Sequence, residues 1–404
     1  MTAAAILERA IAAHAFPAAS VEIGRASAVL WRHAFGRLTY AHDAPSATVD
    51  TVFDLASLTK VIATTSLVMR ALEAGGLSLD DRIADRLGSW RGPDREMVTI
   101  ADLLEHASGL TAYLPFFRDH QGRVEFERAI TTLPLEYAPR TQSIYSDLGF
   151  MLLGFVLEDL NGAPLAQQFD AMWDAAFHLK SGFHLKSGFH LKVEATEKVE
   201  GKEKVEGKEN LKGQIEGRSV RLQAEAHLTF NPPRAWRDRT APTELDLWRG
   251  RLLQGDVHDE NTWALGGAAG HAGLFGTAAA TGAFARAVLR GLTGRAPSIA
   301  RPDTLVRFVT KSRVPGSSRA LGWDTMLPAS SCGQRLSSRA IGHTGFTGTS
   351  LWIDPERDVY VVLLTNRVHP TRENNAIQPV RRAFHDAVAL ALEIDPAAPA
   401  QPSS

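Results

Sequence analysis

Residues 53–76 read FDLASLTKVIATTSLVMRALEAGG, and this stretch decides the fold. Beyond its first turn, apolar side chains recur at helical spacing, at Val61, Val68 and Leu72. Two glycines close the stretch, and glycine is a common residue at the end of a helix. The pattern therefore predicts a long amphipathic helix that begins near Ser57 and ends before Gly75.

Ser57 and Lys60 are three residues apart, so on a helix they face each other across one turn. Ser57 is the one serine in the chain that is followed three residues later by a lysine. The start of a helix offers free N–H groups and the positive end of the helix dipole to developing negative charge. A serine hydroxyl needs a neighbouring base to act as a nucleophile, and a buried lysine with a lowered pKa can serve. The alternative is a helix-capping serine beside a lysine that faces solvent.

Two further short motifs supply candidate partners for this serine. Tyr145-Ser-Asp147 precedes an apolar helical stretch, and His343-Thr344-Gly345 lies in a glycine-rich stretch before a predicted strand. A tyrosine among positive charges can relay protons to a leaving group. A Thr-Gly pair on an edge strand lets a substrate lie alongside and exposes an N–H group to an oxyanion. Each motif also has a plain alternative, because the tyrosine is equally suited to a core and the second motif to a turn.

Predicted strands lie near both ends of the chain, at 20–24, 28–31, 350–353 and 358–365, and predicted helices fill the middle. This order favours a sheet built from both ends, covered by terminal helices, with a helical region inserted between. We therefore expect one unit over residues 1–396. Its α/β part comprises 1–60 and about 280–396, and its helical part about 61–280.

Residues 177–227 break this pattern. FHLKSG occurs twice and is followed by FHLK over 177–192, and KVEGKE occurs twice over 198–209. A six-residue period is too short for a helical solenoid, and the copies are too few to bury the core of a β-helix. The charged, glycine-punctuated composition favours a surface loop. A partner-binding insert is the alternative.

In this order the three motifs resemble those of the serine β-lactamase and penicillin-binding-protein superfamily, especially its class C β-lactamase-like, esterase and D-aminopeptidase branch. Ser57-Leu-Thr-Lys60 corresponds to the S-x-x-K element, Tyr145-Ser-Asp147 to Y-x-N, and His343-Thr344-Gly345 to K-T-G. Similar strings lie at 99–110, 145–154, 255–275 and 342–366, so the resemblance covers about 15–393 apart from the repetitive insert. It implies an α+β fold of the β-lactamase/transpeptidase type. In that fold an antiparallel sheet is flanked by terminal helices, and a mostly helical region is inserted.

The resemblance also implies an acylation–deacylation mechanism that needs no metal and no organic cofactor. Ser57 is expected to attack a carbonyl carbon, Lys60 and Tyr145 to shuttle protons, and water to release the acyl group. The backbone N–H groups of Ser57 and Phe346 are expected to hold the oxyanion, and removing one such donor costs ~3 kcal/mol in the barrier. The substrate and oxyanion site is expected to consist of Asp147, His343, Thr344, Gly345 and Phe346.

Two of these positions depart from the family pattern. Asp147 replaces an asparagine, and a carboxylate donates no hydrogen bonds but can hold Lys60 charged. That arrangement would raise the pKa of Lys60 and shift the role of base toward Tyr145. His343 replaces a lysine that helps β-lactam enzymes to bind a substrate carboxylate, and imidazole is mostly neutral at pH 7. The hypothesis is that neutral acyl esters are preferred to carboxylate-bearing β-lactams.

The composition and net charge of the chain limit the classes of binding partner. The 404 residues are 44% hydrophobic and carry a formal net charge of -1, which argues against a nucleic acid or an anionic membrane as a general partner. No stretch reaches the ~18 consecutive apolar residues that a membrane span needs. Glu8 and Arg9 interrupt the apolar N-terminal region, so no signal peptide is predicted and we expect a cytoplasmic protein. The expected partner is a small ester or amide substrate, and the oligomeric state is left open.

Three functions therefore compete. The leading one is a carboxylesterase that acts on short acyl esters through an acyl-enzyme on Ser57. A β-lactamase or a D-amino-acid peptidase of the same fold is the alternative within this class. A non-catalytic binding homologue is the alternative of another class, and the presence of Ser57, Lys60 and Tyr145 together argues against it.

Overall fold

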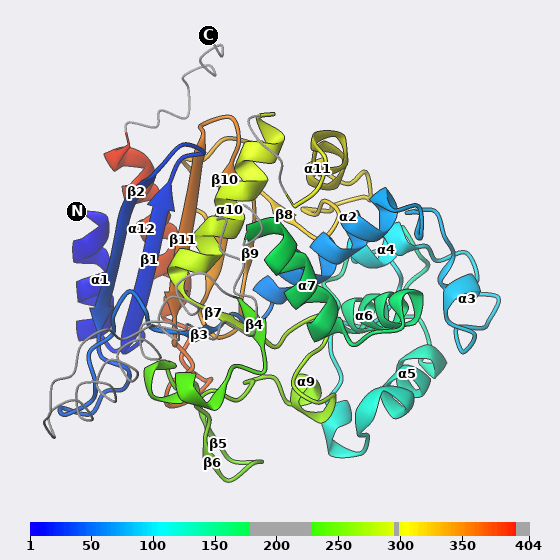
Figure 1. Ribbon diagram of the computed structural model, residues 1–404, viewed down its shortest axis with the longest axis horizontal. Helices are drawn as coiled ribbons and strands as arrows, with labels where there is room; N and C mark the ends of the chain where they lie inside the picture. Colours follow the sequence, from blue (N-terminus) through cyan, green and yellow to red (C-terminus); the bar gives the residue numbers. More distant parts are fainter. Residues whose placement is uncertain (178–227, 295–298, 393–404) are drawn as a thin grey trace, which may run out of the picture.

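A computed structural model describes residues 1–177, 228–294 and 299–392. Its main feature is a six-stranded antiparallel sheet in the order β2-β1-β11-β10-β9-β8 (Figure 1). The strands are β1 (Ala18–Gly24), β2 (Val29–Gly36), β8 (Asp324–Thr325), β9 (Ile341–Thr344), β10 (Ser350–Asp354) and β11 (Val359–Thr365). Both ends of the chain thus contribute to one sheet, as predicted, and the α+β class is confirmed.

Strand β11 lies in the middle of the sheet, between β1 and β10. Its sequence VYVVLLT is apolar without alternation because helices cover both faces of the sheet. Val361 and Leu363 pack toward α1 (Ala3–Ala12) and α12 (Ile377–Ala391), in one hydrophobic cluster. Val362 and Leu364 belong to the other cluster, which includes α10 (Ala278–Leu292). These two layers hold the edge of the sheet from which the candidate site is built.

The part of the molecule beside the six-stranded sheet is mostly helical. It contains α2 (Thr65–Glu73), α3 (Ile83–Arg86), α4 (Ile100–Leu104), α5 (Gly122–Thr132), α6 (Asp147–Asn161), α7 (Leu165–Phe177), α9 (Glu260–Ala264) and α11 (Pro302–Val309), with short turns η2 (Phe116–Arg118) and η3 (Arg234–Arg239). Helix α6 is the centre of this region, because it is buried continuously from Leu148 to Leu157 and packs against α2, α4, α5 and α7. Among the described residues no single helix is long and apolar enough to cross a bilayer, although α6 and α7, bent by 75°, pass that test as a pair.

Two small sheets lie outside the six-stranded sheet. One has the order β3-β7-β4, from β3 (Phe53–Asp54), β7 (Leu274–Gly276) and β4 (Thr229–Phe230), and the other is the hairpin of β5 (Leu245–Asp246) and β6 (Arg251–Leu252). Strand β3 ends three residues before Ser57, so its pairing with β7 holds the segment that leads to the candidate nucleophile.

The helix predicted to begin near Ser57 has a different first part. A π-helical segment, η1 (Lys60–Thr64), precedes α2, and π-turns inside helices are frequent at functional sites. Threonine side chains at both ends of this segment bond to residues 270–274, with Thr64 Oγ1 donating to the Gly270 carbonyl and Leu274 N donating to Thr59 Oγ1. The residues that these bonds join lie far apart in the sequence. Helical periodicity, which is a local pattern, therefore does not reveal the π-helical turn. The predicted division into an α/β part and a helical part, at residues 60 and about 280, stays a prediction. The repetitive insert at 177–227 lies, apart from Phe177, outside the described residues.

Candidate active site

Ser57 lies in the turn between β3 and the π-helical segment. The residue before it, Ala56, has a φ of 47°, which is the left-handed region that non-glycine residues rarely adopt. The buried carboxylate of Asp54 accepts the Ala56 N–H at 2.8 Å and the His258 N–H at 2.7 Å, so it holds this turn against the segment before α9. Burial raises the pKa of Asp54 to about 6, although these two hydrogen bonds oppose the rise. The serine is thus presented on a locally strained turn that a buried acid secures.

Lys60 is fully buried directly beside the serine. Its Nζ lies 3.1 Å from Ser57 Oγ, 2.6 Å from Asp147 Oδ1 and 3.0 Å from the carbonyl oxygen of His271. An ammonium group has three hydrogens to donate, and three acceptors surround it here. The contacts therefore describe a protonated lysine that donates to the serine hydroxyl.

The electrostatics agree with this geometry. Burial acts to lower the pKa of Lys60, but the charges of Asp147 and Tyr145 and their hydrogen bonds outweigh it, so the pKa is raised. The pKa of Tyr145 is also raised. Burial is the cause of this rise, and the positive charge of Lys60 offsets part of it. Because the folded-state pKa of Lys60 is raised, its ion pair stabilises the fold below the ordinary lysine pKa and loses this effect only in strong alkali. The contact with Asp147, which stands at the asparagine position of the motif, thus favours the charged form of Lys60.

Tyr145 precedes α6, where Ser146 caps the helix by accepting the Gly149 N–H. Its ring is surrounded by cations and imidazoles. Lys60 Nζ lies 4.8 Å from the ring centre, the guanidinium carbon of Arg319 lies 5.1 Å from it, and the rings of His106 and His343 lie at 4.7 and 5.8 Å. The phenol also interacts with both Ser57 and Lys60. This is the positively charged setting in which a tyrosine can carry protons.

His343 and Thr344 form the end of β9. The His343 ring is buried, and its Nδ1 donates to the carbonyl oxygen of Thr344 at 2.9 Å. Burial, together with the nearby charges of Arg319 and Lys60, holds the pKa of His343 well below its usual value. This environment favours the neutral imidazole at pH 7.

The predicted edge strand needs a correction. Strand β9 is not the outermost strand, because β8 pairs with it at Ile341 and Gly342. Strand β8 has only two residues, however, and ends before His343 and Thr344. That side of the Thr-Gly motif consequently has no partner strand within the described part of the chain.

The turn after β9 brings the predicted oxyanion group to the serine. The side chain of Thr347 donates to the Asp54 carbonyl at 2.7 Å, and that of Thr349 donates to the Leu55 carbonyl at 3.0 Å. Gly345 is required in this turn, because a Cβ there would lie 2.6 Å from the Leu55 carbonyl oxygen. In the parts of the chain that the structure describes, neither the Ser57 N–H nor the Phe346 N–H donates a hydrogen bond. Both groups are free to hold an oxyanion.

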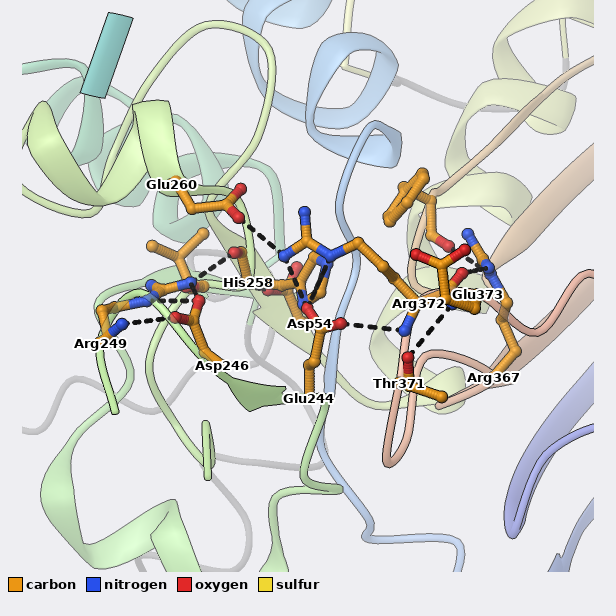
Figure 2. A network of polar contacts seen from close by, with 12 residues as sticks. Asp54, Glu244, Asp246, Arg249, His258, Glu260, Arg367, Thr371, Arg372 and Glu373 are labelled. Carbon is orange, nitrogen blue, oxygen red and sulfur yellow. Dashed lines mark hydrogen bonds and ion pairs between the residues drawn. The ribbon is translucent and has the colours of Figure 1, made fainter. Parts of the chain in front are cut away.

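Three residues of this site carry no sequence motif. Asp54 holds the serine turn, Arg319 contacts the Tyr145 ring, and Arg367 donates from Nε to the Phe346 carbonyl at 2.7 Å. Figure 2 shows Arg367 beside the Arg372 loop, whose carbonyls at Arg372 and Asn374 it also binds at 2.8 Å. Of the three residues, Asp54 alone lies next to a motif in the sequence, three residues before the serine of the S-x-x-K element.

His271 supports the site through its main chain. Its carbonyl binds Lys60, while its Nε2 lies 2.9 Å from Asp259 and 3.1 Å from Thr262 at the start of α9. Among the described residues no group of three or more His, Cys, Asp or Glu side chains is arranged to hold a metal ion.

Comparison with known proteins gives this arrangement a context. Residues 3–181 and 214–384 match the model of the Beta-lactamase family. A protein of Escherichia coli K12, named as a proposed D-alanyl-D-alanine carboxypeptidase, is 27% identical over 379 residues, which cover 88% of this chain and 79% of the relative. The N-acetylmuramyl-L-alanine amidase of Bacillus subtilis is 27% identical over 349 residues, covering 79% of this chain and 68% of the relative.

Solved structures share the fold at lower identity. EstCE1, described as a hydrolase with promiscuous acyltransferase activity, has a TM-score of 0.65 at 20% identity and covers 96% of this chain and 97% of its own. A penicillin-binding-protein homologue from Caulobacter crescentus has a TM-score of 0.66 at 16% identity and covers 96% of both chains. With a family match over most of its length and the same fold, the chain belongs to the β-lactamase family, as a serine hydrolase of the β-lactamase and penicillin-binding-protein fold.

Proposed function

We propose that this serine hydrolase is a carboxylesterase that acts on short, uncharged acyl esters. The observation that carries the proposal is the buried, neutral His343, which stands where β-lactam enzymes use a charged lysine. A neutral imidazole gives a carboxylate-bearing substrate no ionic partner at this strand, whereas an uncharged ester needs none. The exposed Phe346 ring, half accessible to solvent, adds apolar surface next to the oxyanion group.

The proposed reaction has two halves. Ser57 Oγ bonds to the ester carbonyl carbon while its proton passes to the Tyr145 phenolate, and the N–H groups of Ser57 and Phe346 hold the resulting oxyanion. The intermediate then collapses and expels the alkoxide, which takes the proton from Tyr145. In the second half Tyr145 takes a proton from water, the hydroxide attacks the acyl-enzyme, and the proton returns to Ser57 as the carboxylic acid leaves. Lys60 stays charged throughout and stabilises the phenolate. Because burial raises the pKa of Tyr145, the phenolate is a small fraction of the enzyme at neutral pH, and the rate follows that fraction.

Asp147→Asn is expected to move the acid limb of the pH–rate profile to lower pH. The substitution removes a negative charge that raises the pKa of Lys60 and of Tyr145, while the burial of Lys60, which lowers its pKa, remains. The base is then available at lower pH. The measurement is kcat/KM for p-nitrophenyl butyrate across the pH range in which the wild type stays folded. Asp147→Glu keeps the charge and is the control, and an acid limb that stays in place or rises in Asp147→Asn contradicts the proposed base.

A D-peptidase is the second candidate, and Arg319 is the observation that favours it. Its guanidinium lies over the Tyr145 ring and its charge reaches His343, so it can replace the missing lysine as a carboxylate partner. The side chain is one-fifth exposed, and its contact with Asp324 is long, at 4.0 Å. The names of the Escherichia coli and Bacillus subtilis relatives point in the same direction.

Three substrates separate the candidates. For an esterase, kcat/KM for p-nitrophenyl butyrate exceeds that for diacetyl-Lys-D-Ala-D-Ala and for a cephalosporin by at least about tenfold. For a peptidase, the D-Ala-D-Ala substrate is turned over faster than the ester, and Arg319→Gln lowers its kcat/KM by at least about tenfold relative to the ester. A cephalosporin as the best substrate overturns both. Failure to turn over any substrate or to form a fluorophosphonate adduct points to the non-catalytic alternative.

A further inference from the structure

A groove lies beside α9, outside the residues that carry the proposed chemistry. Two cavities of about 430 and 380 Å³ share Gln121, Trp263 and Ala264, so they form one continuous depression. Single sites for small molecules fall in the same range of volumes. None of the residues predicted to act with Ser57 lines it. We call this depression the aromatic groove, and we propose that it binds a neutral saccharide.

Aromatic side chains form one wall of the aromatic groove. The rings of Trp248 and Trp263 meet edge to face at 5.4 Å and 87°, and Phe117 meets Trp248 at 4.6 Å. Trp248 is 46% exposed and Trp263 40% exposed, which is high for such large apolar side chains. Clustered aromatic rings left open to water mark a surface that another molecule covers.

The aromatic wall rests on a rigid support. Arg249 lies beneath both indoles, with its guanidinium carbon 5.9 Å from the Trp248 ring and 6.0 Å from the Trp263 ring. It is buried, forms an ion pair with Asp246 at 2.7 Å, and donates to the carbonyls of Val257 and His258 at 2.7 Å (Figure 2). These bonds keep the wall in place without a ligand, and a preformed wall binds with a smaller entropy cost.

The remaining walls are polar and decide the ligand class. They present both charges and neutral donors and acceptors, from Arg118, Asp119, His120, Gln121, Glu125, Asn231 and Asp256. His120 Nδ1 is buried and has no hydrogen-bond partner among the described residues. A purely apolar ligand would desolvate these groups without compensation. An ionic ligand would meet both signs of charge, whereas a sugar offers an apolar ring face to the indoles and hydroxyl groups to the rim.

The aromatic groove is connected to the catalytic region through one short helix. Asp259 caps α9 and holds His271, whose carbonyl binds Lys60, and Glu260 pairs with Arg372 at 2.7 Å. Trp263 lies one turn further along the same helix. The saccharide proposal does not depend on which acyl substrate the serine uses, and its test measures binding rather than turnover.

The test is a titration of the full chain with N,N′-diacetylchitobiose and with cellobiose. Binding is measured by tryptophan fluorescence and by calorimetry. Saturable binding of at least one disaccharide is expected, with each of Trp248→Ala and Trp263→Ala weakening it about tenfold. Trp31→Ala, on β2, is the matched control and is expected to bind as the wild type does. Hydrolysis of p-nitrophenyl butyrate is expected to stay within about twofold in all three variants, which also shows that they fold.

Three results overturn the proposal. The first is the absence of saturable binding with both disaccharides, and the second is binding that survives in the Trp248→Ala, Trp263→Ala double variant. The third is a concentration-dependent dimer, seen by light scattering, that the double variant abolishes, because the aromatic groove is then an interface between two copies of the chain.

Discussion

Ser57→Ala is expected to lower kcat for p-nitrophenyl butyrate by at least about 10⁴-fold, because removal of a catalytic nucleophile leaves only binding and oxyanion stabilisation. Ser57 Oγ accepts from Lys60, and no other serine in the sequence lies three residues before a lysine. The partly exposed side chain contributes little packing, and the melting temperature is expected to change little. The measurement is single-substrate kinetics together with thermal unfolding.

Covalent labelling distinguishes a lost nucleophile from a lost fold. The wild type is expected to gain one fluorophosphonate adduct on the peptide that contains Ser57, and Ser57→Ala is expected to gain none. Ser143→Ala is the matched control, because the hydroxyl of this serine donates to the Glu105 carbonyl and its variant should be labelled like the wild type. Undiminished turnover by Ser57→Ala shows that the nucleophile lies elsewhere.

Arg367→Met is expected to lower kcat by about 100-fold while KM changes little. Arg367 is buried and donates to the Phe346 carbonyl, and its guanidinium lies 4.4 Å from the centre of the Phe346 ring. Without it the turn that carries the Phe346 N–H loses its outer support. Loss of one oxyanion donor costs about 10²–10³ in kcat, and a displacement of about 1 Å is enough for the lower figure. Arg367 is thus a positioning residue.

The effect on the transition state is measured with phenylboronic acid, which forms a tetrahedral adduct on an active serine. Its affinity is expected to fall in proportion to kcat/KM in Arg367→Met and to recover in part in Arg367→Lys, which restores one donor. Arg95→Met is the matched control, since Arg95 is also buried and bonds to the carbonyls of Thr131 and Leu133, away from the site. It should lose stability but keep kcat. A rise in KM with unchanged kcat in Arg367→Met contradicts a role in the oxyanion site.

The parts of the fold that sequence predicts are those specified locally. The strands β1, β10 and β11 and the helix α6 lie within a few residues of their predicted positions, because apolar spacing and the flanking turn residues identify them. The π-helical segment at Lys60 and the position of β9 inside the sheet were missed. Both depend on partners more than 15 residues away, at residues 270–274 and at β8.

The residues of the candidate site also fall into two groups, those that a local motif identifies and those that depend on contacts with distant residues. Ser57, Lys60 and Tyr145 carry motifs, and the structure brings them into contact. Arg319 and Arg367 have no local pattern, since their roles exist only where β9, β11 and α6 converge. An arginine that binds a carbonyl 21 residues away leaves no trace in hydrophobic spacing or in charge order.

The two threonine bonds between the turn after β9 and the segment before Ser57 also bear on how the protein is made. They join residues 293 and 294 positions apart, so they close a loop that contains most of the chain. Contacts of such long sequence separation form late and slowly. During synthesis the ribosome completes the Ser57 helix long before it reaches Thr347. A nascent chain therefore carries its serine without an oxyanion site, and catalytic competence arrives only after the turn that follows β9 has been synthesised.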